Sequence, residues 1–493
     1  MTMTRRSDPP LPRQPVSRWM ALTAGLAVGG LSAPALAKPH LEPTVGAEVT
    51  VTDNIDLVPN GQRQSAVVFS EFAGLTLREA GRRLRYALDG RLYLDTTVGH
   101  GTDVALRPDV TGTGRIELVE GHLYVEGRLL SQRELINAQG RVGSSSVIGR
   151  SNQANVTTLE LSPYLTGHIG PYADTELRYL HRDTLVDTRD GDGAGAGENR
   201  VGNAMTNALS WQVTSGRALS RLRLTSNIEY SNTRAEVDEN DLERQTAIVS
   251  ADYAVTRQVF LLGSAGWERI ASPGLSDTRR GMIGSVGLRY RPSPRLDLAL
   301  SAGHRYGGPT YEGTLTYAIT SRWSATASYS ESMETPQTRL GRPVGRIALD
   351  PQTGALVIAD ARDLGIQRAV AKVGTLRFDV VGHYQVDDVY LSVTRETRDY
   401  DTGPDDQLLT AGARWHHRLS PRLTLIAQAQ LRQAASDTAE RDASTLTGGV
   451  NLTYALSDTL TGSVSLSRSQ RFSSRSEDRY TENAIVFGLT ARF

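Results

Sequence analysis

An acidic, glycine-rich run between residues 187 and 198 has the residue types best suited to hold a metal ion. Closely spaced carboxylates on a flexible backbone can wrap a hard cation such as Ca²⁺. The run lacks the full ligand spacing of an EF-hand, so we interpret it as a solvated acidic loop and expect no metal and no cofactor. The residues concerned are Asp187, Asp190, Gly191, Asp192, Gly193 and Glu198.

A second candidate is an arginine-rich stretch in the longest predicted connection, residues 334–372. Long connections in compact folds are usually functional or disordered. We keep two hypotheses for it: a loop that folds into the mouth of a pore as a constriction or gate, and an external loop. The candidate gating residues are Arg339, Arg342, Arg346 and Arg362.

Histidines are the remaining residues that could do chemistry. His181, His304 and the pair His416–His417 fall near predicted strand ends or loops. No spacing brings a nucleophile, a base and an orienting group together as a hydrolase requires. We predict that the chain is not an enzyme and name no catalytic residue, with a hydrolase kept as an alternative.

The elements that carry these residues are predicted to be β-strands. Near the end of the chain Ile485, Phe487 and Leu489 alternate with polar or small residues. Successive side chains of a strand point to opposite faces, so this period of two predicts a strand with one apolar and one polar face. The same alternation fills the chain after about residue 40. It therefore predicts an all-β fold.

The connections between these strands alternate in length. About ten tight turns alternate with about eleven longer polar connections, a pattern typical of outer-membrane barrels with short periplasmic turns and long external loops. This predicts a transmembrane antiparallel β-barrel of about 22 strands, in the range 18–22, with a soluble all-β protein as the alternative. The longer connections are expected around 53–65, 96–109, 137–155, 185–203, 233–242, 271–280, 304–310, 334–372, 397–407, 433–443 and 470–481. Trp211, Trp267, Trp323 and Trp415 fit the aromatic girdles of such a barrel, with sugar stacking as the alternative.

Strand alternation begins near Val45, which leaves no room for an N-terminal plug, and we predict a barrel without a plug domain. Its lumen must then be filled by loops, side chains, a partner or water. A mixed polar lining would suit polar or weakly charged solutes. The residues expected to line the lumen are Arg221, Arg223, Glu229, Arg289, Asp297, Arg414, Arg432 and Arg492.

The first 37 residues have the order of a secretory signal peptide. Arginines precede a short apolar stretch, and Ala35-Leu36-Ala37 provides small residues for cleavage. We expect residues 1–37 to be the signal peptide and residues 38–493 the barrel. The mature chain would have a slight excess of acidic residues, which argues against a nucleic-acid partner. Cysteine is absent, so disulfides and thiolate metal sites are excluded.

Short motifs at 52–57, at 161–165 and at 172–179, together with the C-terminal strands, resemble a known family. The chain is similar to the PEP-CTERM system-associated outer-membrane proteins of exopolysaccharide-producing bacteria, which are related to β-barrel porins. The resemblance implies exosortase-type sorting and a channel in the outer membrane that assists exopolysaccharide export or surface assembly. A general diffusion porin and a non-conducting structural or adhesive barrel remain alternatives. The family carries no established catalytic residues.

The final residue, Phe493, fits the aromatic C-terminal signal by which barrel-assembly machinery is thought to recognise its clients. We expect it at the periplasmic end of the strand that closes the barrel near Val45. The partners implied are outer-membrane lipids, the barrel-assembly machinery, and polysaccharide with its export apparatus.

Overall fold

The computed structural model describes residues 39–99, 101–187, 202–345, 347–349, 356–358, 369–436 and 442–493. The chain divides into two units between residues 36 and 37, and only the second contains described residues. The expected signal peptide therefore lies outside them. So do five residues of the acidic run, Asp190, Gly191, Asp192, Gly193 and Glu198, and the candidate gating residues Arg346 and Arg362.

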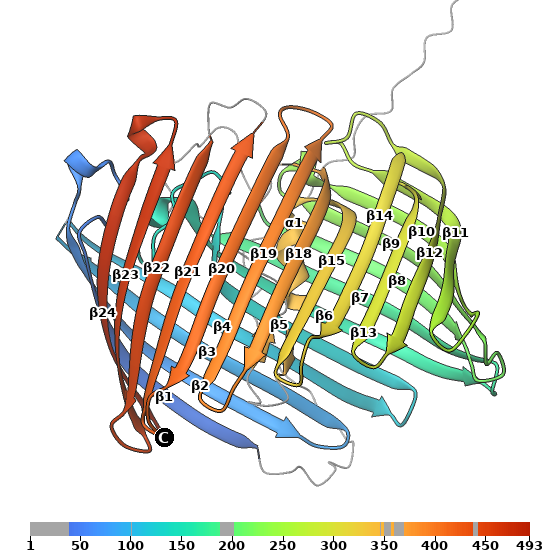
Figure 1. Ribbon diagram of the computed structural model, residues 1–493, viewed down its shortest axis with the longest axis horizontal. Helices are drawn as coiled ribbons and strands as arrows, with labels where there is room; N and C mark the ends of the chain where they lie inside the picture. The colour runs from blue at the N-terminus through green and yellow to red at the C-terminus, as the bar shows by residue number, and fades with distance from the viewer. Residues whose placement is uncertain are drawn as a thin grey trace, which may run out of the picture. The chain divides into compact units, whose positions relative to one another are not determined.

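Among the described residues, twenty-two strands form one sheet (Figure 1). They are β1 (His40–Thr52), β2 (Ala66–Ala80), β3 (Leu84–Val98), β4 (Thr102–Val119), β5 (Leu123–Leu135), β6 (Gln153–Ile169), β7 (Ala173–Asp187), β8 (Ala204–Ser215), β9 (Leu222–Ala235), β10 (Leu242–Ala254), β11 (Val259–Ala271), β12 (Arg279–Ser293), β13 (Leu296–Arg305), β14 (Gly308–Ala318), β15 (Trp323–Glu334), β18 (Ala371–His383), β19 (Asp387–Tyr400), β20 (Asp406–Arg418), β21 (Leu423–Ser436), β22 (Ala443–Ala455), β23 (Leu460–Ser473) and β24 (Tyr480–Arg492). Short 3-10 turns lie at η1 (Asn60–Gln62), η2 (Arg150–Asn152), η3 (Asp238–Asn240) and η4 (Ser476–Asp478).

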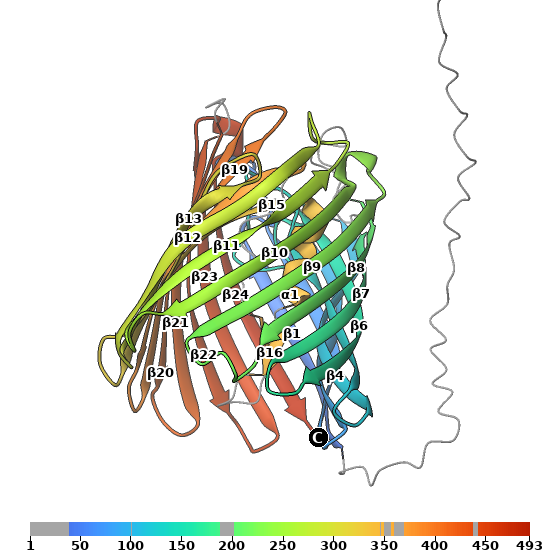
Figure 2. The ribbon, with the colours of Figure 1, turned by 90° about the vertical axis from the view of Figure 1, so that its right-hand side faces the viewer.

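Every strand of this sheet pairs antiparallel with its neighbours, and the first pairs with the last. In the closing seam Thr44 of β1 lies opposite Arg492 of β24, and Thr52 opposite Ala484. The sheet is therefore a closed barrel without a free edge, which removes the unpaired backbone groups that a bilayer cannot satisfy. Figure 2 shows β7–β11 in front, tilted across the strands behind them.

The alternation of side chains explains why these segments are strands with two unlike faces. In β24, Phe487 and Leu489 are 51% and 48% exposed, whereas Glu482 and Ala484 on the opposite face are buried. We call the face with exposed apolar side chains the outer face, and the opposite one the inner face. An apolar outer face and a polar inner face are what a membrane barrel requires.

Two connections are much shorter than expected. β3 and β4 are joined by residues 99–101, and β13 and β14 by Tyr306 and Gly307, both at positive φ. The predicted loops 96–109 and 304–310 are mostly strand, because their polar residues belong to the inner face. Arg107, for example, is bound by Asp95 of the neighbouring strand at 2.8 Å.

The prediction of a barrel without a plug domain is wrong, and two of the predicted long connections fold into the barrel. The connection after β15 contains the helix α1 (Pro336–Gly345) and a two-stranded sheet of β16 (Ile347–Leu349) and β17 (Leu356–Ile358). The connection between β5 and β6 folds against strands far away in the barrel. Alternation could not reveal these segments, because their positions depend on contacts between residues distant in sequence. No helix in the described ranges is long and apolar enough to span a bilayer.

Candidate functional site: the barrel lumen

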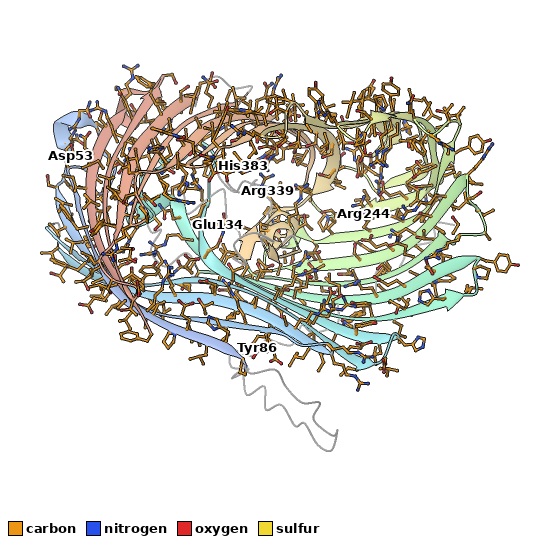
Figure 3. The ribbon with its side chains drawn as sticks, turned by 60° about the horizontal axis from the view of Figure 1, so that its bottom comes forward. Asp53, Tyr86, Glu134, Arg244, Arg339 and His383 are labelled. Atoms are coloured by element: carbon orange, nitrogen blue, oxygen red, sulfur yellow. The ribbon has the colours of Figure 1, made fainter. Side chains whose placement is uncertain are left out.

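The helix α1 lies inside the ring of strands (Figure 3). It follows β15 and contacts β5, β6 and β7. Leu340 packs with Val156 of β6, and Val186 of β7 packs against the pair. A side chain at Gly341 would place its Cβ only 2.5 Å from Nη1 of Arg182. The helix therefore reaches from its own strand to a distant part of the wall.

Local sequence fixes where α1 begins. Thr335 precedes it, and its Oγ1 accepts a hydrogen bond from the backbone N–H of Thr338 at 3.1 Å. The Oγ1 of Thr338 in turn accepts a hydrogen bond from the backbone N–H of Thr335 at 2.7 Å. This reciprocal arrangement is equivalent to a capping box, and Pro336 occupies the first helical position, where its missing N–H costs nothing.

Buried ion pairs hold the other side of α1. Arg339 donates to Oε2 of Glu396 in β19 at 2.9 Å, and Arg342 lies 2.7 Å from Glu334. Burial opposes the charge of Arg339, but Glu396 and Glu334 hold the pKa of its guanidinium above the ordinary value. Glu396 is also bound by Arg398 at 2.6 Å, so one carboxylate lies between two guanidinium groups. Removing one partner of such an arrangement is costly.

One residue of α1 is poorly accommodated. The side chain of Gln337 is 2% exposed, and neither its amide nitrogen nor its amide oxygen forms a hydrogen bond with the described residues. An unsatisfied buried polar group costs about 1–3 kcal/mol. The position of α1 is thus stabilised by ion pairs and opposed by a buried amide.

The 136–152 segment, which joins β5 to β6, also crosses the lumen. Arg471 of β23 donates to the carbonyl of Gly140 at 2.6 Å, and Arg432 of β21 donates to the carbonyl of Ala138 at 3.1 Å. The hydroxyl of Tyr480 donates to the carbonyl of Val142 at 2.6 Å and accepts from its N–H at 2.9 Å. Backbone groups of the segment thus satisfy inward-facing side chains on the distant wall.

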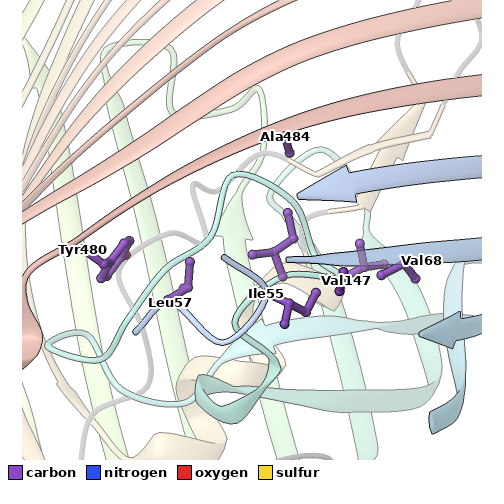
Figure 4. Packing of buried hydrophobic residues seen from close by; sticks show 8 residues of the cluster. Ile55, Leu57, Val68, Val147, Tyr480 and Ala484 are labelled. Carbon is purple, nitrogen blue, oxygen red and sulfur yellow. The ribbon is translucent and has the colours of Figure 1, made fainter. Parts of the chain in front are cut away.

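An apolar cluster anchors the 136–152 segment (Figure 4). Val147 and Ile148 pack with Ile55 and Leu57 of the connection between β1 and β2, and with Tyr480. Gly149 has a φ of +68°, and a Cβ there would lie 2.3 Å from Leu57, so glycine permits both the turn and the packing. These contacts fix one side of the lumen near the loop end of the barrel.

Elsewhere on the inner face, single carboxylates are shared by two arginines. Glu160 is bound by Arg128 at 2.8 Å and by Arg182 at 2.6 Å. Glu268 is bound by Arg244 at 2.7 Å and by Arg305 at 2.6 Å. Such charge-assisted pairs are strong and directional, and they make parts of the wall rigid.

The structure places the predicted lining residues other than Arg221 on the inner face but does not bring them into one site. Arg289 donates to Asp297 at 2.8 Å, Arg414 donates to Gln428 at 3.3 Å, and Arg432 is buried below Ala138. Arg221 lies in the turn before β9, and Arg492 ends β24. Arg223 and Glu229 share the face of β9 opposite Ile228 and Tyr230, which are exposed on the outer face.

The candidate histidines and the four candidate tryptophans lie near the turns or on the outer face. Nδ1 of His417 lies 2.6 Å from Asp387, and Nδ1 of His416 lies 3.4 Å from Asp388. No group of three potential metal ligands occurs within the part of the chain that the structure describes. Trp211, Trp267 and Trp415 are 39–49% exposed on the outer face, as in an aromatic girdle.

The carboxylates that organise the lumen, Glu160, Glu268 and Glu396, were not predicted from the sequence. The sequence does indicate these ion pairs, because residues at equal distances from a hairpin turn lie opposite each other. In the β6–β7 hairpin, Glu160 faces Arg182 and Tyr164 faces Arg178, mirrored about Pro171. If the turn were instead centred between Gly170 and Pro171, the register would shift by one residue and every side chain would be assigned the wrong partner.

Comparison with known proteins supports this architecture. Residues 408–493 match the family model described as "Putative beta-barrel porin 2". The chain has a porin-like β-barrel fold. No curated protein matches it. Because the match covers only the last strands, the resemblance to PEP-CTERM-associated proteins stays a prediction.

Solved structures with a similar fold include siderophore receptors and an iron transporter. A ferric enterobactin receptor of Pseudomonas aeruginosa (PfeA), in complex with enterobactin, has a TM-score of 0.51 at 11% identity, covering 93% of this chain and 82% of that one. The siderophore receptor PirA of Acinetobacter baumannii gives 0.49 at 10% identity, with 92% and 80% covered. The FrpB iron transporter of Neisseria meningitidis gives 0.48 at 11% identity, with 91% and 82% covered.

These likenesses correct the predicted fold class further. The barrel shares its fold with the enterobactin receptor, and outer-membrane barrels of 22 strands have plugged lumens, which contradicts the prediction of a barrel without a plug domain. In the described residues, α1 and the 136–152 segment occupy the lumen. A large closed β-barrel whose last strands match a porin family model indicates an outer-membrane protein.

Proposed function

We propose that the protein is a gated outer-membrane channel that assists exopolysaccharide export or surface assembly alongside a PEP-CTERM and exosortase-type sorting system. The observation that carries the proposal is α1, which lies inside the lumen between buried ion pairs on one side and the β5–β7 wall on the other. An element that is held by a few charges can be released, which is what a gate requires.

The chemistry of the lumen supports a polar, weakly charged solute. Its strongest charges are neutralised in pairs, as in Arg289–Asp297 and Arg107–Asp95. Between them lie hydroxyl and amide groups such as Asn451, which donates to Ser465 at 2.5 Å. Sugars form hydrogen bonds with groups of this kind, so the lining is compatible with saccharide passage.

Two alternatives differ from the proposal in conductance. A general diffusion porin would keep an open lumen, and the two crossing segments argue against it. A structural or adhesive barrel would not conduct at all. The unsatisfied amide of Gln337 favours a gate over a permanent seal, because it lowers the free energy needed to displace α1.

The processing and assembly steps are also part of the proposal. Residues 1–37 would be removed as a signal peptide, and the barrel of residues 38–493 would be inserted by the barrel-assembly machinery. The backbone N–H of Phe493 donates to the carbonyl of Pro43 at 3.0 Å, and its side chain is 74% exposed. An exposed terminal aromatic ring is accessible to an assembly factor and contributes little to the folded barrel.

Gene deletion tests the role in export. Loss of secreted polysaccharide with normal uptake of small solutes is expected, and reintroducing the wild-type gene should restore secretion. Unchanged polysaccharide secretion in the deletion strain would contradict the export role. Slower uptake of small solutes in the same strain would instead support a general porin.

A further inference from the structure

The inner face along β10–β14 carries a cavity that neither α1 nor the 136–152 segment lines. Its volume is about 440 Å³, within the roughly 300–1,000 Å³ typical of small-molecule sites. Its floor consists of short side chains from four neighbouring strands. These are Ser250, Ser264, Ser285, Ser301 and Gly303.

The packing of the wall explains why the floor has only short side chains. A Cβ at Gly303 would lie 2.2 Å from the carbonyl oxygen of Gly284, and one at Gly287 would lie 2.5 Å from that of Leu300. Larger residues at these glycines would force the strands apart. The hydroxyls of Ser264 and Ser285 lie 2.7 Å apart and give the floor a hydrogen-bonding surface.

Ion pairs bound the cavity at both ends. Toward the loops, Glu268 is held by Arg305 and Arg244, so these charges are already neutralised in part. Toward the turns, Asp297 is bound by Arg289 and Arg291. The floor between these ends carries no charge of its own.

Two further carboxylates line the cavity, and among the described residues neither Asp252 nor Glu312 forms a hydrogen bond or a salt bridge. Asp252 interacts with Arg289 through charge alone, without a direct contact. Carboxylates accept hydrogen bonds from hydroxyl groups and repel anions. The combination favours a ligand that is rich in hydroxyls and carries no negative charge.

We infer that this cavity, the β10–β14 groove, is a binding subsite for a neutral saccharide chain. The inference rests on the proposed channel function and names its substrate class. Hydroxyls of the sugar would bond to Asp252, Glu312 and the serine floor, while the absence of long side chains leaves room for the ring. An anionic polysaccharide would be repelled by the same two carboxylates.

Cysteine labelling tests the groove directly, because the natural chain contains no cysteine. Ser285→Cys and Ser301→Cys place a thiol in the groove. Ser469→Cys is the matched control, since Ser469 is fully buried and donates to the carbonyl of Val142 in the 136–152 segment. Each variant is refolded, checked for heat-modifiable migration, and treated with a small neutral methanethiosulfonate reagent.

The groove variants should react at least ten-fold faster than Ser469→Cys. Maltohexaose should slow their labelling several-fold, whereas hexagalacturonate, which is anionic, should not. Equal rates in groove and control variants, no protection by maltohexaose, or stronger protection by hexagalacturonate would each overturn the inference. Labelling does not need ion flow, so a barrel that fails to conduct would contradict the channel function without deciding this result.

Discussion

The two sides of the wide lumen are filled to different extents. Along β5–β7 and β19–β24, the interior is filled by α1 and the 136–152 segment, which are held by buried charges and by hydrogen bonds to their backbone. Along β10–β14, short side chains leave a cavity. The comparison teaches that the lumen is neither a plain pore nor uniformly filled. One side is occupied by chain segments, and the other offers a polar surface.

Arg339→Ala should have the largest effect. The side chain of Arg339 is 14% exposed, and its loss leaves Glu396 and Glu334 without this partner. Breaking a buried ion pair costs about 3–5 kcal/mol, enough to release α1. Single-channel conductance in planar bilayers should rise several-fold. Arg82→Ala, at an arginine that is 79% exposed in a turn, is the control; equal conductance of the two variants would show that α1 does not restrict the pore.

Ser285→Trp should have the opposite effect on the other side of the lumen. The indole would fill the β10–β14 groove and reduce the conductance by about half or more, since it would occupy the space that the short side chains leave open. Val286→Trp adds the same side chain to the outer face of the same strand, where Val286 is 74% exposed. If both variants conduct alike, the groove is not part of the path.

Tyr480→Phe should weaken the attachment of the 136–152 segment to the barrel wall without releasing the segment. The change removes the hydroxyl that bonds both the carbonyl and the N–H of Val142, at a cost of about 1–2 kcal/mol. Hydrogen exchange of amides in residues 138–149 should accelerate up to about ten-fold. Tyr253→Phe, on the outer face, should leave these amides unchanged. Equal exchange in both variants would contradict the anchoring role of Tyr480.

A small pH effect should appear where two loops meet. Asp401 accepts hydrogen bonds from Ser276 and pairs with Arg279. Burial would raise the pKa of Asp401, but these partners hold it below the ordinary value of 3.8. The ionised Asp401 therefore stabilises the folded loops above pH 3.8, and this contribution is lost as the pH falls through the lower folded-state pKa.

Hydrogen exchange near residues 272–278 measures this effect. Exchange, corrected for its intrinsic pH dependence, should increase in the wild type only under acid conditions below the ordinary Asp pKa. Asp401→Asn should remove that acid step, and Asp277→Asn, at an exposed neighbour, should retain it. An acid step that survives in Asp401→Asn would assign it to another group.

The outer face was accessible to sequence reasoning, because lipid contact imposes the same apolar pattern on every strand. The inner face could be predicted only in part from the sequence. Arg107 and Asp103 look like loop residues in the sequence, yet they lie in β4 because Asp95 and Arg150 provide partners. A charged strand residue cannot be distinguished from a loop residue until its partner across the sheet is known.

The segments that fill the lumen were harder still to predict from the sequence. Gly341, Pro343 and Gly345 argue against a helix at residues 336–345, and α1 forms because tertiary contacts of Leu340 and Arg339 outweigh propensity. The 136–152 segment carries no periodic pattern, and its partners Arg471 and Tyr480 lie more than 300 residues away. The sequence therefore predicted both connections as long loops and left open whether the 334–372 loop enters the barrel mouth.

The most direct test of the central claim is the conductance of the refolded wild-type barrel in a planar bilayer, measured beside Arg339→Ala. A gated channel predicts small or intermittent currents for the wild type and larger, sustained currents for the variant. Absence of current in both, with correctly folded protein, would contradict the channel. Large, steady currents in both would contradict the gate.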